Sequence, residues 1–598
     1  MTRWDRRRAK TRLAWIADLT GRGLDRPAAR ERVDTAIRAG GLVPVEARYT
    51  TQVAREREAT ILRIERDGRG QVAPVLVAES ARSRLDATTL NSGQRAAAEL
   101  MLTTGNRVVG VQGFAGTGKS HMLDTAKGMI EQEGYRVRAL APYGSQVKAL
   151  QALNVEVNTL ASFLKAKDKR IDVRTVLVID EAGVVPARQM EQVLRIAEKA
   201  GARVVLMGDT AQTKAIEAGR PFDQLQVAGM STAAMAEIQR QKNPELKKAV
   251  ELAAVGQTGA SLARIGAVIE IADHSARRAA IARDYTALSP PDRDRTIIVS
   301  GTNEARRDLN RMVREGLGVA GKGLEYDTLV RRDTTQAERR HSKTYHIGDV
   351  IQPEQDYQRL GMKRGALYRV EDTGPGNRLV VRRMTEEREA SPVPGRVAPE
   401  GETIAFSPRL ATKLSVYQHQ RAELSVGDRV RITRNNAELD VANGDRFRVE
   451  VVTRDRVTLG NGARRVELTA DRPLHLDHAY ATTVHSSQGL TADRVLIDAH
   501  AESRTTAKDV YYVAISRARH EARIYTNSAK TLPAAIMWET IKHAALDLAR
   551  EHGGLTGDRT RRTLHERMRE RTVDAAQSRE QGRQGGNKEK GRRREVGG

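Results

Sequence analysis

The chain has 598 residues, of which 39% are hydrophobic, and Lys and Arg outnumber Asp and Glu by 101 to 76. It contains no cysteine, which excludes disulfides, thiolate catalysis and cysteine-ligated zinc, and no uninterrupted apolar stretch of about 18 residues that would predict a membrane span. The net charge of +25 favours a polyanionic partner, with nucleic acid as the first candidate. An arginine-rich composition with a basic tail is the alternative explanation of this charge.

The first half of the chain divides into a helical region and an α/β region. Residues 1–88 have charged amphipathic patterns that predict helices. Residues 89–230 alternate helical patterns with short β-branched runs, which read RVVGVQG, YRVRALAP, TVLVIDEAG and ARVVLMGD. This alternation predicts a parallel sheet covered by helices, with ligands bound at the carboxyl ends of the strands. Residues 231–344 continue in the same style.

The pattern changes after residue 344. Residues 345–470 contain short strands with Gly-rich turns, which predict a small all-β module. Two GD-[RV]-[VI] segments, each followed by a G-x-x-[YF]-x-V-E element, indicate two related β units. The α/β pattern returns in residues 471–545, and residues 546–598 are charged and Gly-rich, which predicts a basic disordered tail.

The segment 113–120 reads GFAGTGKS and matches the phosphate-binding pattern G-x-x-x-x-G-K-[ST]. An apolar strand precedes it and a helical stretch follows it, as in a P-loop. Backbone N–H groups of the loop would cradle the phosphates, Lys119 would reach the β- and γ-phosphates, and Ser120 would hold Mg²⁺. The predicted nucleotide contacts in this loop are Gly113, Gly116, Thr117, Gly118, Lys119 and Ser120.

Two later strands supply acidic and amide groups. The strand in VLVIDEAG (176–183) would deliver Asp180 to the metal ion and Glu181 to the attacking water. The segment LMGDTAQ would bring Asp209 and Gln212 across the site, where the Gln212 amide would contact the γ-phosphate. A turn with a helix-capping aspartate is the alternative interpretation of this segment.

Two arginines stand out further along the chain, Arg240 in IQRQ and Arg517 in VYYVAISRAR. Phosphoryl transfer is favoured by cationic groups placed on the developing negative charge. We expect both arginines to come from a second α/β lobe and to reach the phosphates when the lobes close. A surface salt bridge is the alternative for either arginine considered alone.

Seven segments in this order resemble the motifs of superfamily 1 helicases, and within them the RecD-like group, in particular the helicase half of TraI/TrwC-type conjugative relaxases. The segments are LNSGQRAA (90–97), GFAGTGKS (113–120), DEAG (180–183), GDTAQTKAIEAGRPF (208–222), IQRQ (238–241), YATTVHSSQGLTADRVLI (480–497) and YVAISRAR (512–519).

The resemblance implies an α/β protein with two RecA-like parallel-sheet lobes, an N-terminal helical region and an SH3-like β insert in the second lobe. It implies that ATP binds between the lobes and that Gln94 reads adenine. The implied hydrolytic residues are Lys119, Ser120, Asp180, Glu181 and Gln212, with Arg240 and Arg517 as arginine fingers.

The resemblance also implies a strand-binding surface. Thr159, His485 and Gln488 fall in motifs that contact single-stranded DNA or couple it to ATP. Tyr143 stands in APYGSQ where the family has threonine, so its ring would either stack on a base or pack within the fold. The implied activity is ATP hydrolysis that drives 5′-to-3′ movement on single-stranded DNA, in the cytoplasm.

A full relaxase has, in addition, a nucleophilic tyrosine and a three-histidine metal site in an N-terminal domain. Here only residues 1–88 precede the motor, and the histidines of HLDH (475–478) are interpreted as structural. We therefore expect a fragment of a longer relaxase, a truncated gene or a helicase-only relative, with other conjugation proteins as partners. The alternatives are a RecD-like repair or recombination motor, a DNA-binding scaffold with weak motor activity, and an RNA-directed enzyme.

Overall fold

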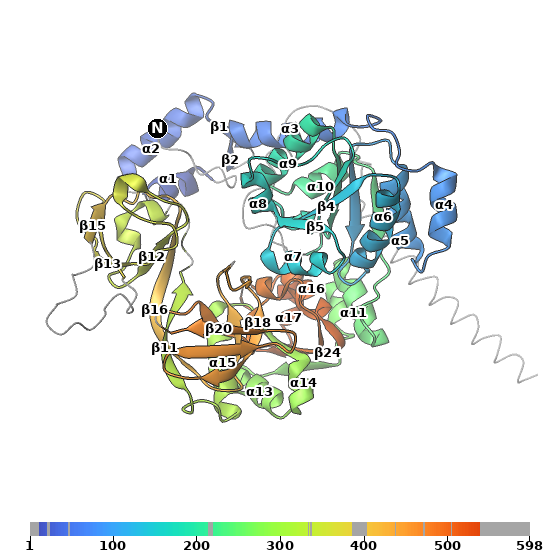
Figure 1. Ribbon diagram of the computed structural model, residues 1–598. Helices are drawn as coiled ribbons and strands as arrows, with labels where there is room; N and C mark the ends of the chain where they lie inside the picture. Colours follow the sequence, from blue (N-terminus) through green and yellow to red (C-terminus); the bar gives the residue numbers. More distant parts are fainter. Residues whose placement is uncertain are drawn as a thin grey trace, which may run out of the picture.

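The computed structural model describes residues 11–538, except 21–23, 46–47, 213–218, 333, 335–337, 385–402, 437, 471–472 and 504. The tail predicted at residues 546–598 lies outside the described residues. The described part comprises an N-terminal helical region, two lobes built on parallel sheets, and two antiparallel sheets (Figure 1). Within it, no helix combines the length and the apolar character needed to cross a membrane.

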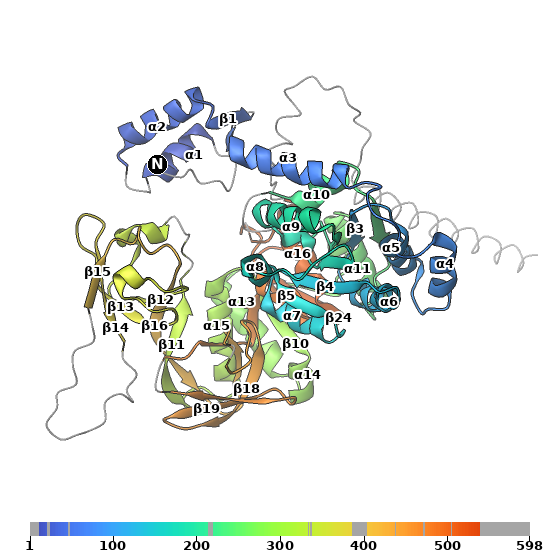
Figure 2. The same cartoon turned by 45° about the horizontal axis from the view of Figure 1, so that its top comes forward.

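The N-terminal region has a small core of its own. Helix α1 (Arg12–Thr20) packs on α2 (Arg26–Arg38), and β1 (Leu42–Val45) forms an antiparallel hairpin with β2 (Arg48–Thr51). The buried side chains are Trp15, Ile16, Leu19, Ala29, Val33 and Leu42. Helix α3 (Gln52–Asp67) then lies along the first lobe (Figure 2), where Arg57 forms a 2.9 Å ion pair with Glu191, and α4 (Ala78–Asp86) follows.

The first lobe is built on a six-stranded sheet in the order β5-β4-β6-β7-β3-β8, in which all strands are parallel. The parallel sheet predicted from the β-branched runs is therefore confirmed. Its strands are β3 (Val108–Gly113), β4 (Arg136–Ala141), β5 (Glu156–Thr159), β6 (Thr175–Ile179), β7 (Arg203–Gly208) and β8 (Thr232–Met235). Its helices are α5 (Ser92–Thr103), α6 (Lys119–Gln132), α7 (Gly144–Gln151), α8 (Leu160–Lys165), α9 (Ala187–Ala200) and α10 (Pro221–Val227), with a short 3₁₀ helix η1 (Ala182–Val184).

Strand β8 extends the first sheet beyond the boundary predicted at residue 230. It pairs in parallel with β3, so that Thr232 lies opposite Gly110. A Cβ at Gly110 would lie 2.7 Å from the Thr232 hydroxyl oxygen, so glycine permits this close approach. Arg240 therefore lies in the segment that follows a strand of the first sheet, whereas we expected it on the second lobe.

The second lobe contains a five-stranded parallel sheet in the order β22-β10-β23-β24-β9. Its strands are β9 (Ala267–Glu270), β10 (Thr296–Ser300), β22 (Ala481–Thr483), β23 (Ala492–Ala499) and β24 (Ala518–Thr526). Its helices are α11 (Pro244–Ala254), α12 (Thr258–Leu262), α13 (His274–Thr286), α14 (Pro290–Asp294), α15 (Asn303–Gly316), α16 (Lys508–Ser516) and α17 (Leu532–Met537). Because β10 and β22 are neighbours in the sheet, everything between α15 and β22 is an insert in this lobe.

The insert holds two antiparallel sheets and begins at β11, before the start predicted at residue 345. The first sheet has the order β11-β16-β12-β13-β14-β15 and the second β20-β19-β18-β17-β21. The strands are β11 (Leu324–Arg331), β12 (Val350–Pro353), β13 (Tyr368–Asp372), β14 (Leu379–Arg383), β15 (Thr403–Phe406), β16 (Leu414–Leu424), β17 (Arg429–Ile432), β18 (Arg446–Val452), β19 (Arg456–Gly460), β20 (Arg465–Thr469) and β21 (Leu476–His478). Among the described residues after α15, the short 3₁₀ helices are η2 (Glu338–Arg340), η3 (Ser342–Thr344), η4 (Gln358–Leu360) and η6 (His485–Ser487).

The two sheets share one local arrangement, in line with the repeated sequence pattern. The N–H of Gly348 donates to the carbonyl oxygen of Val370 at 2.8 Å, and the N–H of Gly427 donates to that of Val449 at 2.8 Å. Both glycines have a positive φ, of 89° and 92°, which requires glycine at this turn. Each turn is followed by a buried aspartate and the first strand of its β unit.

Candidate nucleotide site between the two lobes

The segment between β3 and α6 has the geometry expected of a P-loop. Gly116 and Gly118 have φ values of +83° and +78°, where glycine is favoured. A Cβ at Gly116 would lie 2.6 Å from the Cβ of Arg240, and one at Gly118 would lie 2.4 Å from Nε2 of Gln94. These glycines allow both the turn and the close approach of two neighbouring segments, while Gly113 ends β3 in the buried core.

Lys119 and Ser120 begin the helix that follows the loop. The Lys119 ammonium donates to the carbonyl oxygens of Gly113 at 2.8 Å and Phe114 at 3.3 Å. The Ser120 side chain is exposed, whereas the Thr117 hydroxyl is buried and donates to the Phe114 carbonyl oxygen at 2.9 Å. Thr117 therefore stabilises the loop, and nucleotide contact by Lys119 and Ser120 stays a prediction.

Gln94 lies buried against the P-loop. Its Nε2 donates to the carbonyl oxygen of Thr117 at 3.0 Å, and its Oε1 accepts the N–H of Asn91 at 3.0 Å in the capping box of α5. The amide nitrogen of Gln94 thus joins α5 to the loop and its amide oxygen caps α5, and the reading of adenine by Gln94 stays a prediction.

Asp180 and Glu181 follow β6 at the same edge of the sheet. Burial, and then the negative charge of Glu181, raise the pKa of Asp180 to about 6, against the opposing charge of Lys119. Glu181 has a φ of +48°, which is uncommon for a residue with a side chain. Two adjacent carboxylates at the end of a buried strand are costly unless a cation meets them, so this edge fits a metal ion.

Asp209 and Gln212 follow β7 and are both buried. The carboxylate of Asp209 accepts hydrogen bonds from Nε2 of Gln112 and Nε2 of Gln212, each at 3.3 Å, and from the N–H of Ala211 at 2.9 Å. In this arrangement the Gln212 amide is held by Asp209, next to the P-loop strand. The rest of this motif, residues 213–218, lies outside the described residues.

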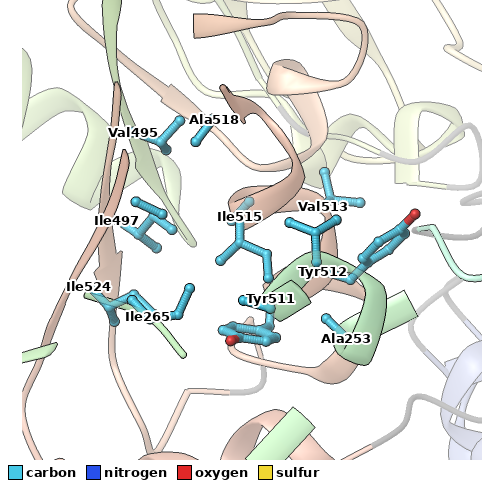
Figure 3. Packing of buried hydrophobic residues seen from close by; sticks show 14 of the residues in the cluster. Ala253, Ile265, Val495, Ile497, Tyr511, Tyr512, Val513, Ile515, Ala518 and Ile524 are labelled. Carbon is cyan, nitrogen blue, oxygen red and sulfur yellow. The ribbon is translucent and has the colours of Figure 1, made fainter. Parts of the chain in front are cut away.

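Tyr512 of α16 reaches the same cluster from the second lobe, although the sequence interpretation did not assign it a role. Its hydroxyl donates to Oδ2 of Asp209 at 2.8 Å and accepts the P-loop N–H of Ala115 at 2.8 Å. Figure 3 shows the Tyr512 ring pointing away from the strands of the second sheet, with its hydroxyl leaving the apolar cluster. The sequence feature that could have indicated this role is the pair of adjacent tyrosines in an apolar helix, because a buried phenol needs a hydrogen-bond partner.

Arg240 and Arg517 lie together beside the P-loop, one from each lobe. Nη1 of Arg240 donates to the Ser516 carbonyl oxygen at 3.0 Å, and Nε of Arg517 donates to that of Val513 at 3.0 Å. Burial lowers the pKa of both guanidinium groups, to about 10 for Arg517, where the charge of Arg240 adds to the effect. The charge of Glu181 acts in the opposite direction on both. Both guanidinium groups thus lie close to the P-loop and Glu181, and their contact with phosphates stays a prediction.

The four residues predicted to contact the strand follow the ends of sheet strands. Tyr143 follows β4 and is 47% exposed, so its ring does not pack in the core. Thr159 is the last residue of β5, and its hydroxyl accepts a hydrogen bond from the N–H of Ser162 at 3.1 Å, which caps α8. His485 is exposed and Gln488 partly buried in the segment after β22. Strand contact by these side chains stays a prediction.

The sequence matches two family models. Residues 89–273 match the AAA domain, and residues 478–525 match the UvrD-like helicase C-terminal domain. The first range holds the P-loop, β8 and Arg240, and the second holds His485, Tyr512 and Arg517. The chain thus contains an AAA domain followed by a UvrD-like helicase C-terminal domain. The resemblance drawn from the ordered motifs is thus confirmed.

Among characterised proteins, the chain is similar to two conjugation proteins. It is 28% identical over 588 residues to the multifunctional conjugation protein TraI of Escherichia coli K12, a match that covers 86% of this chain and 31% of TraI. It is 28% identical over 528 residues to the conjugal transfer protein TraA of Rhizobium radiobacter, covering 83% of this chain and 38% of TraA. The chain spans about a third of the length of the curated relatives it matches.

Two solved helicase structures were also matched. The Pif1 helicase from Bacteroides, in complex with ADP-AlF3 and ssDNA, is 17% identical with a TM-score of 0.38, covering 78% of this chain and 97% of that chain. The Pif1 helicase from Candida albicans is 17% identical with a TM-score of 0.42, covering 78% of this chain and 100% of that chain.

Proposed function

We propose that the protein is an ATP-driven motor that moves along single-stranded DNA. The observation that carries this proposal is the meeting of both lobes at the P-loop, where Arg240 and Arg517 converge near Glu181 and Tyr512 holds the N–H of Ala115. A nucleotide bound here would touch both lobes. Binding and hydrolysis would therefore alter the angle between the lobes.

The residues at this edge suit hydrolysis of ATP. Lys119 would exchange its loop carbonyl partners for the β- and γ-phosphates, and Glu181 would accept a proton from the attacking water. Gln212 would orient that water. The guanidinium groups of Arg240 and Arg517 would stabilise the charge that develops on the transferred phosphoryl group.

The donor set at the loop fits Mg²⁺. The exposed Ser120 hydroxyl and the Asp180 carboxylate are hard oxygen ligands, and the raised pKa of Asp180 is that of a buried carboxylate with too little positive charge around it. Over the described residues there is no group of three or more His, Cys, Asp or Glu that could hold a metal ion. When bound with ATP, Mg²⁺ would neutralise charge on the phosphates.

Contacts with the single-stranded DNA would be made at the ends of β-strands, by Tyr143, Thr159, His485 and Gln488. These residues lie on both lobes, so a change in the lobe angle would move one contact set relative to the other. The half-exposed ring of Tyr143 suits stacking on a base. The 5′-to-3′ polarity follows from the RecD-like resemblance alone.

The cellular role we propose is the transfer of plasmid DNA, because the matched relatives TraI and TraA are conjugation proteins. The motor would then work in the cytoplasm, where ATP and the transferred strand meet, with other conjugation proteins as partners. A RecD-like repair motor is the competing role. Co-purification with coupling proteins supports transfer, and co-purification with nuclease subunits supports repair.

The decisive experiment measures ATP hydrolysis with and without single-stranded DNA. We expect strong stimulation by the strand in the wild type and none in Lys119→Ala, which should still bind the strand. Glu181→Gln should bind ATP and turn it over very slowly. Strand binding without stimulation would instead favour a scaffold, and stimulation by RNA but not DNA would contradict the conjugation role.

A tailed-duplex assay then tests polarity. Duplexes with a 5′ or a 3′ single-stranded tail differ only in the end on which the motor loads. Displacement from the 5′-tailed substrate alone is expected, and displacement from the 3′-tailed substrate alone would contradict the proposed direction.

A further inference from the structure

One face of the second β sheet of the insert carries four arginines. Arg429 lies directly opposite Arg448, and Arg431 lies opposite Arg446, on the paired strands β17 and β18. The residues that alternate with them, such as Val430 and Phe447, belong to the apolar core of this sheet. Like charges placed directly opposite each other on a sheet are destabilising, so this face needs compensating negative charge.

The carboxylates at this face are too few for its arginines. Asp294 of α14 pairs with both Arg429 and Arg448, the latter at 2.7 Å. Asp477 of β21 is likewise shared, with Arg431 at 3.0 Å and with Arg306 of α15 at 2.6 Å. These two carboxylates are thus shared by four guanidinium groups, and Arg446 is not one of the four.

Arg446 adds a fifth positive charge. Within the part of the chain that the structure describes, it forms no ion pair or hydrogen bond through its side chain. Burial lowers its pKa to about 10, and the charges of Arg431 and Arg429 lower it as well. A partly buried guanidinium that faces other guanidinium groups is the environment that an anion would stabilise.

A cavity of about 310 Å³ is lined by two of these arginines, Arg429 and Arg448, and by Tyr285. The charge of Arg446 acts on Tyr285, although Arg446 itself does not line the cavity. Its walls include Arg293, Asp294, Arg429 and Arg448, and the buried Tyr285 ring forms part of its floor. This volume is at the lower end of the range for small-ligand pockets, which is roughly 300–1,000 Å³. The cavity therefore offers space for a small anionic group next to unneutralised positive charge.

The cavity is separate from the nucleotide site. Helix α14 precedes β10, so the cavity lies toward the amino ends of the second parallel sheet, whereas His485 follows the carboxyl end of β22. None of the lining residues belongs to the predicted nucleotide or strand contacts.

We propose that this cavity is a second phosphate site, which binds a phosphate ester carried by a free nucleotide or by a nucleic-acid strand. Guanidinium forks match phosphate oxygens in pairs, and Arg448 and Asp294 at the mouth are each half exposed, so a phosphate can displace the carboxylate. Binding would offset the repulsion on the arginine face. The proposal does not depend on ATP hydrolysis by the motor.

The first test compares thermal unfolding of the whole protein in sodium phosphate and in sodium chloride of equal ionic strength. Three proteins are compared: the wild type, Arg446→Gln, and Arg465→Gln as the matched control. Arg465 is an exposed arginine on β20 of the same sheet, paired with Glu450 at 2.6 Å. Phosphate also reaches the P-loop, but that contribution is common to all three proteins.

In chloride, Arg446→Gln should unfold at a higher temperature than the wild type, because one repelling charge is gone. Phosphate should raise the unfolding temperature of the wild type and of Arg465→Gln clearly more than that of Arg446→Gln. If phosphate raised the unfolding temperature of all three proteins equally, the proposal would be overturned. If Arg446→Gln fails to fold, Arg448→Gln at the mouth replaces it.

The second test distinguishes the sources of the phosphate. AMP is titrated in the thermal assay, and a photoreactive single strand is cross-linked and its attachment sites are mapped by mass spectrometry. If AMP raises the unfolding temperature of the wild type more than that of Arg446→Gln, the cavity is a nucleotide site. If the strand cross-links to residues 285–294 or 427–448 in the wild type but not in Arg446→Gln, the cavity is a strand site. A phosphate effect without either result would mean an adventitious ion only, and would overturn the proposal.

Discussion

The Tyr512 hydroxyl donates a 2.8 Å hydrogen bond to the carboxylate of Asp209, which joins the second lobe to the strand end of the first. The same oxygen accepts the P-loop N–H of Ala115 at 2.8 Å. One buried phenol therefore links the loop that would hold phosphate to the aspartate that holds Gln212. Tyr512 is therefore a positioning residue that connects α16 of the second lobe to the P-loop and to Asp209 of the first lobe.

Replacing Tyr512 by phenylalanine keeps the ring in its apolar cluster but leaves the Ala115 N–H without its acceptor. An unsatisfied buried donor costs about 1–3 kcal/mol, so we expect lower thermal stability. We also expect a fall of about tenfold in DNA-stimulated kcat, with a smaller change in KM for ATP, because the loop and the Asp209 cluster are no longer joined. Steady-state ATPase assays with and without DNA provide the measurement.

Tyr511→Phe is the matched control for this prediction. Tyr511 precedes Tyr512 in α16, is buried, and shares a 2.9 Å hydrogen bond with Ser261 inside the second lobe. Its loss should lower stability by a similar amount and leave DNA stimulation intact. Equal loss of stimulation in both variants would show that only the packing of α16 matters.

A buried ion pair between helix α13 and strand β23 of the second lobe gives a prediction about stability. Arg277 and Asp498 are 1% and 5% exposed at their side chains and lie 2.8 Å apart. Removing one member of such a pair leaves a buried charge and costs about 3–5 kcal/mol. Arg277→Leu should therefore lower the free energy of unfolding by about that amount in denaturant titrations.

Two companion variants test the reason for this cost. The double variant Arg277→Leu with Asp498→Leu should recover part of the loss, because the buried Asp498 charge is then also removed. In this variant Arg278 loses its 3.8 Å pairing with Asp498 and keeps its ion pair with Asp308. Arg264→Leu removes an exposed arginine that pairs with Glu245 at 2.8 Å, and should cost about 0–1 kcal/mol. A double variant as unstable as Arg277→Leu would show that packing, and not charge burial, sets the cost.

The sequence predicts the strands of both lobes well but not all of their neighbours. Runs such as VVGVQG and TVLVI are β-branched and wholly buried, so their pattern identifies strands in a covered parallel sheet. Strand β8 reads TAAM, which lacks that pattern, and it joins the first sheet only through its pairing with β3. Hydrophobic pattern indicates a strand, whereas the choice of partner depends on contacts far apart in the chain.

The same limit applies to the candidate site. The P-loop, Asp180 and the two arginines follow from ordered motifs, because each motif holds its residues at fixed local spacing. Tyr512 and Asp209 are more than 300 residues apart, and no local spacing relates them. The two separate sheets of the insert were indicated by a repeated pattern, but the pairing of the long strand β16 with both β11 and β12 in the first of them was not.

A contact between the first lobe and the insert predicts how long the motor stays on DNA. Lys148 of α7 donates to Asp445, in the segment before β18, at 2.5 Å, and Arg464 holds the same carboxylate at 2.8 Å. This contact is made by α7, whose N-cap residue is Tyr143, the predicted base-stacking residue. Lys148→Ala should therefore speed dissociation from single-stranded DNA, by about fivefold for an ion pair worth about 1 kcal/mol.

Dissociation into a heparin trap, followed by strand fluorescence, measures this rate. Lys127→Ala is the control, because Lys127 pairs with Glu131 at 2.7 Å within α6 and does not link the lobe to the insert. ATP hydrolysis without DNA should be unchanged in both variants. An unchanged dissociation rate in Lys148→Ala would mean that the contact with the insert does not retain the strand.

The raised pKa of Asp180 predicts an unusual dependence of stability on pH in the nucleotide-free protein. Its pKa is about 6 in the fold against 3.8 for the model group. Between these values the folded state binds the proton more tightly than the unfolded state, so this group makes stability fall as pH rises and keeps it lowered above about 6. Asp180→Asn should therefore be more stable than the wild type at pH 7.5, by up to about 3 kcal/mol, with the difference vanishing near pH 4.

Thermal unfolding across pH tests this prediction, and Asp67→Asn is a control with the opposite sign, because the Arg66 hydrogen bond lowers the pKa of Asp67. The wild type should also lose kcat/KM for ATP as the pH falls below about 6, when Asp180 takes up its proton and no longer offers an anionic oxygen to Mg²⁺. Saturating Mg²⁺ should move that fall to lower pH, because cation binding favours the ionised carboxylate. A stability difference that is constant from pH 4 to pH 7.5 would contradict the assignment of the buried proton to Asp180.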